Sequence, residues 1–314
     1  MGYKTDFAKA RNLSWQTFGK KITFYLPGMF HYNNMTGQYP AISITGGSCE
    51  LQCDHCRGKI LSSMVQAPDP DTLVAKCRDL EKKGHIGVLL SGGSDLKGRL
   101  PWEIFVKAIR QIKQTTHLLV SVHSGFLSYF QAEALKKAGV DQVLIDVIAD
   151  ERTFETICHL PFTRKEMKHT LTTLTNAGLS IVPHIVCGVY QGQIRGEYEA
   201  VDLLKEFSVD KLVIVSLMGI DGTPMAQNPG PSAEQVADVI AYARIMLPNI
   251  CISLGCARKR GDRQLEILAI QCGVNGMALP SDEAIEMAMA LGLKIKYQKT
   301  CCSVSQNYST STWA

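Results

Sequence analysis

Short apolar runs alternate with longer helix-like segments along most of this chain of 314 residues. The apolar runs have strand length, and several of the helix-like segments end at glycine, as a left-handed helix cap requires. The predicted strands are 41–45, 86–91, 118–123, 142–147, 180–186, 211–216, 250–254 and 276–279. The predicted helices are 70–83, 101–113, 129–138, 164–177, 197–207, 232–247, 262–272 and 281–291. Eight such units predict an α/β fold of the (β/α)8 TIM-barrel type.

The predicted barrel leaves a short segment at each end of the chain. We expect an N-terminal extension at 1–40, the barrel at 41–292 and a C-terminal tail at 293–314. No repeat of constant period and no linker divides the chain. The last residues, 303–314, are polar, and we expect them to be mobile.

Composition and charge exclude several classes of protein. Hydrophobic residues make up 46% and charged residues 20%, as in ordinary globular proteins. A net charge of +4 is too weak to indicate nucleic-acid binding. The apolar runs are too short to span a membrane, and the polar N-terminus lacks the apolar core of a signal peptide. We therefore expect a cytoplasmic protein that binds neither nucleic acid nor membrane.

Three cysteines, Cys49, Cys53 and Cys56, lie in the run GGSCELQCDHCRGKIL, directly after the first predicted strand. Their spacing is C-x3-C-x2-C. Protein [4Fe–4S] clusters usually take four cysteines. Three thiolates leave one iron with an open site that a small molecule can chelate. The run therefore predicts a catalytic cluster.

Two other interpretations of this run stay open. Cys53, His55 and Cys56 can belong to a zinc site, because C-x2-C is the usual zinc knuckle. A structural zinc site needs a second ligand pair, and neither a second C-x2-C nor an H-x3–5-H follows in the sequence. The three thiols can also be buried packing residues.

Other polar residues fall at the ends of the predicted strands, where barrels of this type carry their chemistry. Glycines after the second strand let the backbone approach a ligand closely. Each position also has a plain interpretation, as a turn residue or a solvated charge. The candidates on this rim are Gly92, Gly93, Ser94, His123, Asp146, His184, Cys187, Gly188, Cys256 and Arg258.

The remaining cysteines divide into packing positions and a tail pair. Eleven cysteines, an odd number, in a long chain without an export signal favour metal–sulfur chemistry over disulfides. Cys77 and Cys272 lie in helical segments and fit packing, whereas Cys158 has no assigned role. Cys301 and Cys302 are adjacent in the tail, and with Cys256 they form a candidate ligand set for a second iron–sulfur cluster. The alternative is that they are incidental thiols in a mobile tail.

The three-cysteine spacing just after a first strand resembles the radical SAM superfamily. The resemblance extends over nearly the whole chain, through the segments FYLPGMFHY, ITGGSCELQCDHCRGKIL, LLSGGSD, VPHIVCGVYQG, LGCARKRG and ALPSDEAIEMAMALGLK. Their order resembles the biotin and thiamin synthase-related branch. The forms CDHCRGKIL and VPHIV are most similar to the two-protein, archaeal-type lipoyl synthases.

The resemblance implies particular cofactors and site residues. Cys49, Cys53 and Cys56 would hold a [4Fe–4S] cluster whose open iron binds S-adenosylmethionine (SAM), and one electron would split SAM to a 5′-deoxyadenosyl radical. The superfamily usually has Gly-Gly-Glu where this chain has Gly92-Gly93-Ser94. The superfamily also has a Gly-x-Ile-x-Gly segment that contacts adenine. The corresponding segment of this chain, HIVCG, lacks the first Gly. The implied SAM-binding residues are Gly92, Gly93, Ser94, Asp146, Arg164, Ile185 and Gly188.

The implied reaction is sulfur insertion into a C–H bond of an octanoyl chain carried on a lipoyl-domain lysine. The single-chain lipoyl synthases have cysteines near the N-terminus, but this chain has none before Cys49, so a second, sulfur-donating cluster has to use Cys256, Cys301 and Cys302. The implied partners are a second radical SAM subunit, the octanoylated carrier protein, and a reductant such as ferredoxin or flavodoxin.

Other functions are compatible with the same residues. A radical SAM maturase of a metallocofactor, or another biotin synthase-like enzyme, shares the barrel. A maturase often needs no second catalytic cluster. A different class is a zinc or iron–sulfur scaffold protein without turnover.

Overall fold

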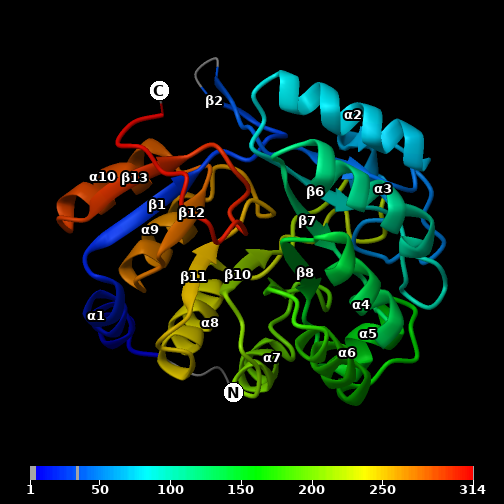
Figure 1. The fold of residues 1–314 in the computed structure, drawn as a ribbon. Coiled ribbons are helices and arrows are strands. Elements are labelled where there is room, and N and C mark those ends of the chain that lie inside the picture. The colour runs from blue at the N-terminus through cyan, green and yellow to red at the C-terminus, as the bar shows by residue number, and fades with distance from the viewer. Residues whose placement is uncertain (1–4, 33–34, 314) are drawn as a thin grey trace.

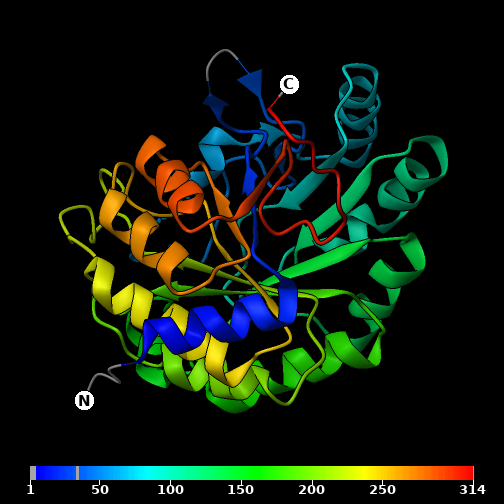
Figure 2. The same cartoon turned by 90° about the vertical axis from the view of Figure 1, so that its left-hand side faces the viewer.

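A curled sheet of parallel strands forms the centre of the protein, with helices along its outer face (Figures 1 and 2). The computed structural model describes residues 5–32 and 35–313. The sheet has 11 strands in the order β13-β1-β12-β11-β10-β9-β8-β7-β6-β4-β5. From β4 to β12 neighbouring strands follow one another in the chain, apart from the short edge strand β5, as right-handed βα units require.

All eight predicted strands are confirmed, each within three residues of its predicted ends. They are buried on both faces, which explains why they are almost continuously apolar in sequence. Their bounds are β4 (Ala41–Ser43), β6 (Gly87–Ser91), β7 (Leu119–His123), β8 (Gln142–Asp146), β9 (Ile181–Cys187), β10 (Lys211–Ser216), β11 (Cys251–Leu254) and β12 (Gly276–Ala278). The predicted α/β barrel-type fold is therefore confirmed.

The predicted helices are also confirmed. Polar caps fix where several of them begin: Ser128, Thr163 and Ser232 each form a capping box with a Gln or Glu three residues later. The bounds are α2 (Pro70–Lys82), α3 (Trp102–Thr115), α4 (Tyr129–Ala138), α6 (Arg164–Asn176), α7 (Glu197–Leu204), α8 (Ala233–Met246), α9 (Arg263–Gln271) and α10 (Asp282–Ala290).

The structure contains further elements that were not predicted. α1 (Phe7–Phe18) packs against α8, and α5 (Glu151–Thr156) is a short helix after β8. β2 (His31–Tyr32) and β3 (Met35–Thr36) form a small hairpin, β5 (Val65–Gln66) pairs with β4, and η1 (Lys59–Ser63) is a 3-10 helix. No helix in the part of the chain that the structure describes has the length and apolar character needed to cross a membrane.

The segments on either side of the predicted barrel contribute strands to the sheet. β1 (Lys21–Tyr25) lies between β12 and β13 (Lys294–Gln298), parallel to both. The eighth barrel strand, β12, therefore pairs with β1 and not with β4. The two margins of the curled sheet still approach each other, because Gln38 N donates to Lys299 O at 2.6 Å. The N-terminal segment thus contributes β1 to the sheet, and the C-terminal segment contributes β13.

The chain after β13 turns into the space enclosed by the sheet, where the red tail is visible in Figures 1 and 2. Cys301, Cys302 and Val304 are buried there against inward-facing residues of the strands, including Val182 and Val213. The expectation of a mobile segment at 303–314 is therefore wrong for its first residues, since Ser303 and Val304 are 1% exposed.

Polar groups at the start of the strands hold this tail in place. Gln142 Nε2 donates to Ser303 O at 3.3 Å, and Ser305 N donates to Gln142 Oε1 at 3.2 Å. Lys211 Nζ donates to Val304 O at 3.2 Å and to the hydroxyl of Tyr25 at 2.9 Å. Buried polar groups require partners of this kind, so a polar sequence can be ordered inside the sheet.

Candidate functional site

The loop after β4 holds the three clustered cysteines in a fixed, compact turn. Arg57 N donates to Cys53 O at 2.8 Å, and Cys56 N donates to the same oxygen at 3.1 Å. Gln52 and Arg57 have left-handed backbone, with φ of 49° and 43°. Such values are uncommon outside glycine and are maintained only when neighbouring structure fixes them. Cys53 and Cys56 are buried, and Cys49 is partly exposed.

A cavity of about 290 Å³ adjoins this loop. It lies at the carboxyl ends of β6, β7 and β8, where the sequence placed the chemistry. The residues that line it include all three cysteines and four of the predicted SAM-binding residues: Cys49, Cys53, Cys56, Gly92, Gly93, Ser94 and Asp146.

The backbone at Gly92, Gly93 and Ser94 packs directly against the cysteine loop. A Cβ atom at Gly93 would lie 2.0 Å from Ser48 O and 2.5 Å from Cys49 Cα, so only glycine fits. Glu50 N donates to Ser94 O at 2.8 Å, and Gly93 N donates to Thr45 Oγ1 at 2.7 Å. These glycines therefore allow a close backbone approach, as predicted, and the surface that they approach is the cysteine loop.

Three other predicted SAM-binding residues are not among the residues that line this cavity. Arg164 is exposed at the start of α6. Ile185 is buried in the layer between sheet and helices, because alternate residues of β9 point to opposite sides of the sheet. Gly188 N donates to Glu197 Oε1 at 2.7 Å, at the start of α7.

Asp146 is the acidic group of the cavity, and three histidines surround it. His123 Nε2 lies 3.6 Å from Asp146 Oδ1, and the His123 and His184 rings are 5.8 Å apart. Partial desolvation opposes ionisation of Asp146, whose side chain is 46% exposed, but the neighbouring His123, His184 and His55 outweigh it and lower the pKa of Asp146 to about 2. Burial and the charge of His123 lower the pKa of His184 to about 4. Near neutral pH the cavity thus has an ionised carboxylate beside a neutral His184.

The same cavity contains features that the sequence did not indicate. His55 lines it, and its Nδ1 atom is buried without a hydrogen-bond partner among the described residues. Burial lowers the pKa of His55. Cys158, which had no predicted role, also lines the cavity. The position of Cys158 in the sequence gives no signal of this, because it lies about a hundred residues from the cysteine loop.

The three other candidate cysteines come together inside the curl of the sheet. The Cys302 thiol hydrogen-bonds to both Cys256 and Cys301. At both Cys256 and Cys301 the interaction with Cys302 has a larger effect than burial. It lowers the pKa of Cys256, and it lowers the pKa of Cys301 to about 6. Ser303 Oγ also donates to Cys301 Sγ at 3.0 Å. We refer to Cys256, Cys301 and Cys302 as the tail thiol set.

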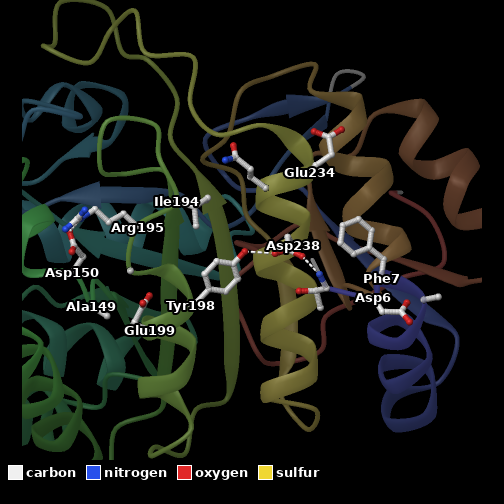
Figure 3. Close-up of a pocket in the computed structure, with 14 residues that line it drawn as sticks. Asp6, Phe7, Ala149, Asp150, Ile194, Arg195, Tyr198, Glu199, Glu234 and Asp238 are labelled. Carbon is white, nitrogen blue, oxygen red and sulfur yellow. Dashed lines mark hydrogen bonds and ion pairs between the residues drawn. The ribbon is translucent and has the colours of Figure 1, made fainter. Parts of the chain in front are cut away.

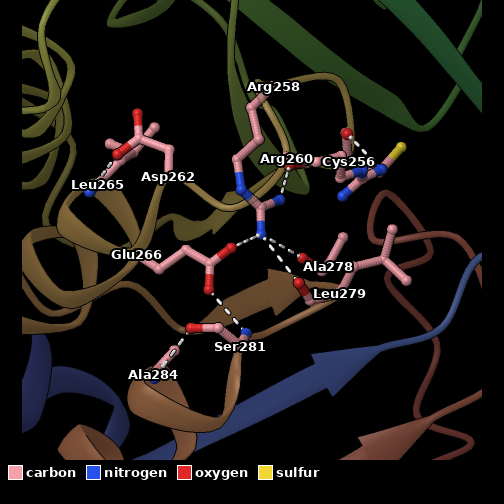
Figure 4. Close-up of polar contacts among 11 residues, drawn as sticks. Cys256, Arg258, Arg260, Asp262, Leu265, Glu266, Ala278, Leu279, Ser281 and Ala284 are labelled. Carbon is pink, nitrogen blue, oxygen red and sulfur yellow. Dashed lines mark hydrogen bonds and ion pairs between the residues drawn. The ribbon is translucent and has the colours of Figure 1, made fainter. Parts of the chain in front are cut away.

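Arg258 anchors the loop that contains Cys256 (Figure 4). Its side chain is 1% exposed, and Nη2 lies 2.7 Å from Glu266 Oε1. The same nitrogen donates to Ala278 O at 2.8 Å, and Nη1 donates to Gly255 O at 2.5 Å. These contacts make Arg258 a structural residue that fixes the position of Cys256.

The donor atoms present fit iron–sulfur chemistry better than a single metal ion. Within 5–32 and 35–313, no three or more His, Cys, Asp or Glu side chains converge on one point where a metal ion could bind. A structural zinc ion needs four ligands at one point. In a [4Fe–4S] cluster each thiolate binds a different iron, so Cys49, Cys53 and Cys56 do not need to converge. Cys77 and Cys272 are fully buried away from the cavity, as expected for packing residues.

A larger cavity, of about 1230 Å³, lies outside this region (Figure 3). It is lined by the start of α1, the loops after β8 and β9, and the start of α8, and it contains many acidic side chains. The hydroxyl of Tyr198 donates to Asp238 across it, and Arg195 pairs with Asp150 at 2.9 Å. None of the predicted site residues line it.

Two family models match consecutive parts of the chain. The radical SAM superfamily matches residues 43–193, which include the cysteine loop and the residues around its cavity. The biotin and thiamin synthesis associated domain matches residues 213–310, which include the whole tail thiol set.

The chain also resembles characterised proteins of this kind. Biotin synthase of Geotalea daltonii is 25% identical over 241 residues, covering 75% of this chain and 72% of that protein. Biotin synthase of Thermotoga neapolitana is 26% identical over 244 residues, covering 75% and 85%.

Solved structures share the fold at low sequence identity. HydG, a maturase of the [FeFe]-hydrogenase, has a TM-score of 0.65 at 15% identity, covering 92% of this chain and 67% of that one. Methylornithine synthase has a TM-score of 0.63 at 15% identity, covering 92% and 88%. The shared fold agrees with the two family matches, which identify residues 43–193 as a radical SAM superfamily domain and residues 213–310 as a biotin and thiamin synthesis associated domain.

Proposed function

We propose that this chain is a sulfur-inserting radical SAM enzyme, and specifically one subunit of a two-protein lipoyl synthase. Membership of the superfamily implies a [4Fe–4S] cluster and SAM, and Cys49, Cys53 and Cys56 would hold that cluster. The substrate would be an octanoyl chain on a lipoyl-domain lysine. C–H bonds of such a chain do not yield to acid–base chemistry, so a radical is required.

The observation that supports this proposal most strongly is the tail thiol set. Cys301 and Cys302 come from the end of the chain, yet they contact Cys256 inside the curl of the sheet. The charge of Cys301 also acts on His123, which lines the cavity beside the cysteine loop. Three thiols so near the SAM cavity are the ligands that a sulfur-donating cluster would need.

When bound, the two clusters would supply the electron that splits SAM and the sulfur that replaces the abstracted hydrogen. The side chains of the protein would bind and orient the reactants and shield them from water. Asp146 offers an ionised acceptor for a hydroxyl group of the nucleoside. Arg258 fixes the Cys256 loop, and the inward-facing valines keep water away from a carbon radical.

Cluster binding at the tail thiol set requires local rearrangement. The Cys302 thiol packs directly against Cys256 and Cys301, whereas thiolates of a cluster bind separate irons. The side chains therefore have to move apart as the cluster assembles. The depressed pKa values of Cys256 and Cys301 favour loss of their protons, which metal binding requires.

The proposal includes three partners. A second radical SAM subunit would add the other sulfur, an octanoylated carrier protein would present the substrate, and ferredoxin or flavodoxin would deliver electrons. If the work is divided in this way, the isolated chain adds at most one sulfur to each octanoyl chain.

The experiment that tests the proposal is mass spectrometry of an octanoylated carrier peptide after anaerobic incubation with the reconstituted chain, SAM and reductant. The expected product has gained one sulfur, and the chain contains about eight irons, four for each cluster. Two sulfurs added by the isolated chain would contradict the division of labour. About four irons with SAM cleavage but no sulfur transfer would favour a maturase-like enzyme, and zinc without SAM cleavage would favour a scaffold.

A further inference from the structure

A fourth cysteine, Cys158, faces the cleavage-cluster cavity from the segment after α5. It is 6% exposed and lines the cavity together with Cys49, Cys53 and Cys56. It contacts Cys53 directly, because Cys53 Sγ lies 3.9 Å from Cys158 O. The cavity thus contains four thiols, which is the number that a [4Fe–4S] cluster usually takes.

The residues on both sides of Cys158 contact Asp54 of the cysteine loop, one through its backbone and the other through its side chain. Asp54 N donates to Ile157 O at 2.9 Å, and His159 Nε2 lies 3.0 Å from Asp54 Oδ1. His159 has left-handed backbone with φ of 57°, an unfavourable conformation for a residue with a side chain. Asp54 thus contacts both neighbours of Cys158 and places its thiol beside the cysteine loop.

A second observation indicates that this cavity binds a group. His55 lines it, and Nδ1 of its ring is buried with no hydrogen-bond partner in the described parts of the chain. Buried polar atoms of this kind nearly always have a partner. A bound group would supply one, and the donors around it are four thiols, an imidazole and a carboxylate.

We propose that Cys158 is a fourth thiolate ligand of the cleavage cluster, bound to the iron that the other three cysteines leave open until SAM replaces it. The proposal rests on the cluster assigned above and does not depend on the identity of the substrate. In the exchange the Fe–S bond to Cys158 breaks, and bonds from iron to the amino nitrogen and carboxylate oxygen of SAM form. The proton lost by the SAM ammonium group balances the proton gained by the Cys158 thiolate, and no electron is transferred.

Such an exchange would keep the open iron closed to solvent until SAM arrives. It would also weaken the apparent binding of SAM, because SAM competes with an internal ligand. If about nine in ten clusters have Cys158 bound in the absence of SAM, the apparent dissociation constant rises about tenfold. Removal of the competing thiolate should therefore tighten SAM binding by about that factor.

The test compares Cys158→Ala and Cys158→Ser with the wild-type chain after anaerobic reconstitution. Cys77→Ala serves as the matched control, since Cys77 is also buried but lies in α2, away from the cavity. Iron content, the EPR spectrum of the reduced cluster with and without SAM, and the dissociation constant of SAM are measured. The serine variant preserves the packing and shows whether an alanine effect is merely a folding defect.

Both Cys158 variants are expected to retain about four irons at this site. Without SAM their EPR spectra should differ from the wild type, and with SAM the three spectra should coincide. The dissociation constant of SAM should fall about tenfold in both variants and stay unchanged in Cys77→Ala. Identical spectra without SAM, together with an unchanged dissociation constant, would overturn the role of Cys158 while leaving the cluster intact. A wild-type chain that assembles no cluster would instead overturn the cluster assignment itself.

Discussion

The cysteine loop after β4 and the tail thiol set each bring three cysteines together, but by different means. Cys49, Cys53 and Cys56 lie within eight residues, and the local turn determines how they are arranged. Cys256, Cys301 and Cys302 are neighbours because the chain after β13 turns back into the curl of the sheet. The first group is therefore a local motif, whereas the second depends on the whole fold. Mutations in the two groups of cysteines should therefore have different effects.

The largest expected effect is on the local motif. Cys53→Ala leaves the cleavage cluster only two of the three loop thiolates, and Cys158 would have to stay on the iron that SAM needs. The change should therefore reduce conversion of SAM to 5′-deoxyadenosine by more than about 100-fold, since even outer-shell partners of a metal site can contribute 10–100-fold. Chromatographic measurement of 5′-deoxyadenosine checks this, with Cys77→Ala as the control for loss of a buried cysteine. Cleavage near the wild-type rate would show that the cluster lies elsewhere.

The second prediction concerns a variant that lacks two cysteines of the tail thiol set and keeps the cysteine loop intact. A Cys301→Ala, Cys302→Ala double variant should lose about half of its reconstituted iron, because one of two four-iron clusters is missing. It should still cleave SAM, and it should no longer transfer sulfur to an octanoylated peptide. Iron analysis and mass spectrometry provide the readouts. If full iron content and sulfur transfer both persist, the tail cysteines are bystanders and the maturase-like alternative becomes stronger.

A third prediction concerns the anchor of the Cys256 loop. Arg258→Met leaves Glu266 as an unpaired buried charge and should lower the free energy of unfolding by about 3–5 kcal/mol. Arg263→Ala is the matched control, because the Arg263–Glu283 pair is largely exposed and should contribute less than about 1 kcal/mol. Urea unfolding of the cluster-free proteins measures both changes. Equal losses in the two variants would show that Arg258 does not fix this loop.

The smallest expected effect concerns Glu197, which holds the backbone of Gly188 and Arg195 after β9. Burial raises the pKa of Glu197 to about 7. Because the folded chain then binds the proton more tightly than the unfolded chain, the stabilisation is present at low pH and is lost as pH rises from about 4.5 to 7.

Glu197→Gln removes this titration. The difference in unfolding free energy between wild type and variant should therefore fall by roughly 3 kcal/mol across that pH range. Denaturant unfolding at a series of pH values measures it. A difference that stays constant with pH would mean that Glu197 does not titrate in the folded chain. It would also mean that the end of β9 near Gly188 is organised differently from the end of β4 at the cysteine loop.

Sequence patterns predicted the strand and helix order well because those patterns are local. Each strand from β4 to β12 is a short apolar run, and each following helix has its own cap and period. The same patterns did not reveal β1 or β13. Both strands alternate apolar residues with polar ones, Lys21 and Thr23 in β1 and two lysines in β13, so they do not stand out as fully buried strands. Their place in the sheet depends on pairing with each other and with β12.

The residues of the candidate site divide in the same way, into those that local patterns predicted and those that only the fold brings together. The sequence by itself determined the cysteine loop, the glycine turn beside it and Asp146, because barrel topology brings successive strand ends to one rim. Only the tertiary structure decided that Cys158 joins that cavity, that Ile185 faces the helices, and that a polar tail is buried. The physical reason is that buried polar residues need partners, and the partners of Ser303 and Val304 are Gln142 and Lys211, which are far away in the sequence.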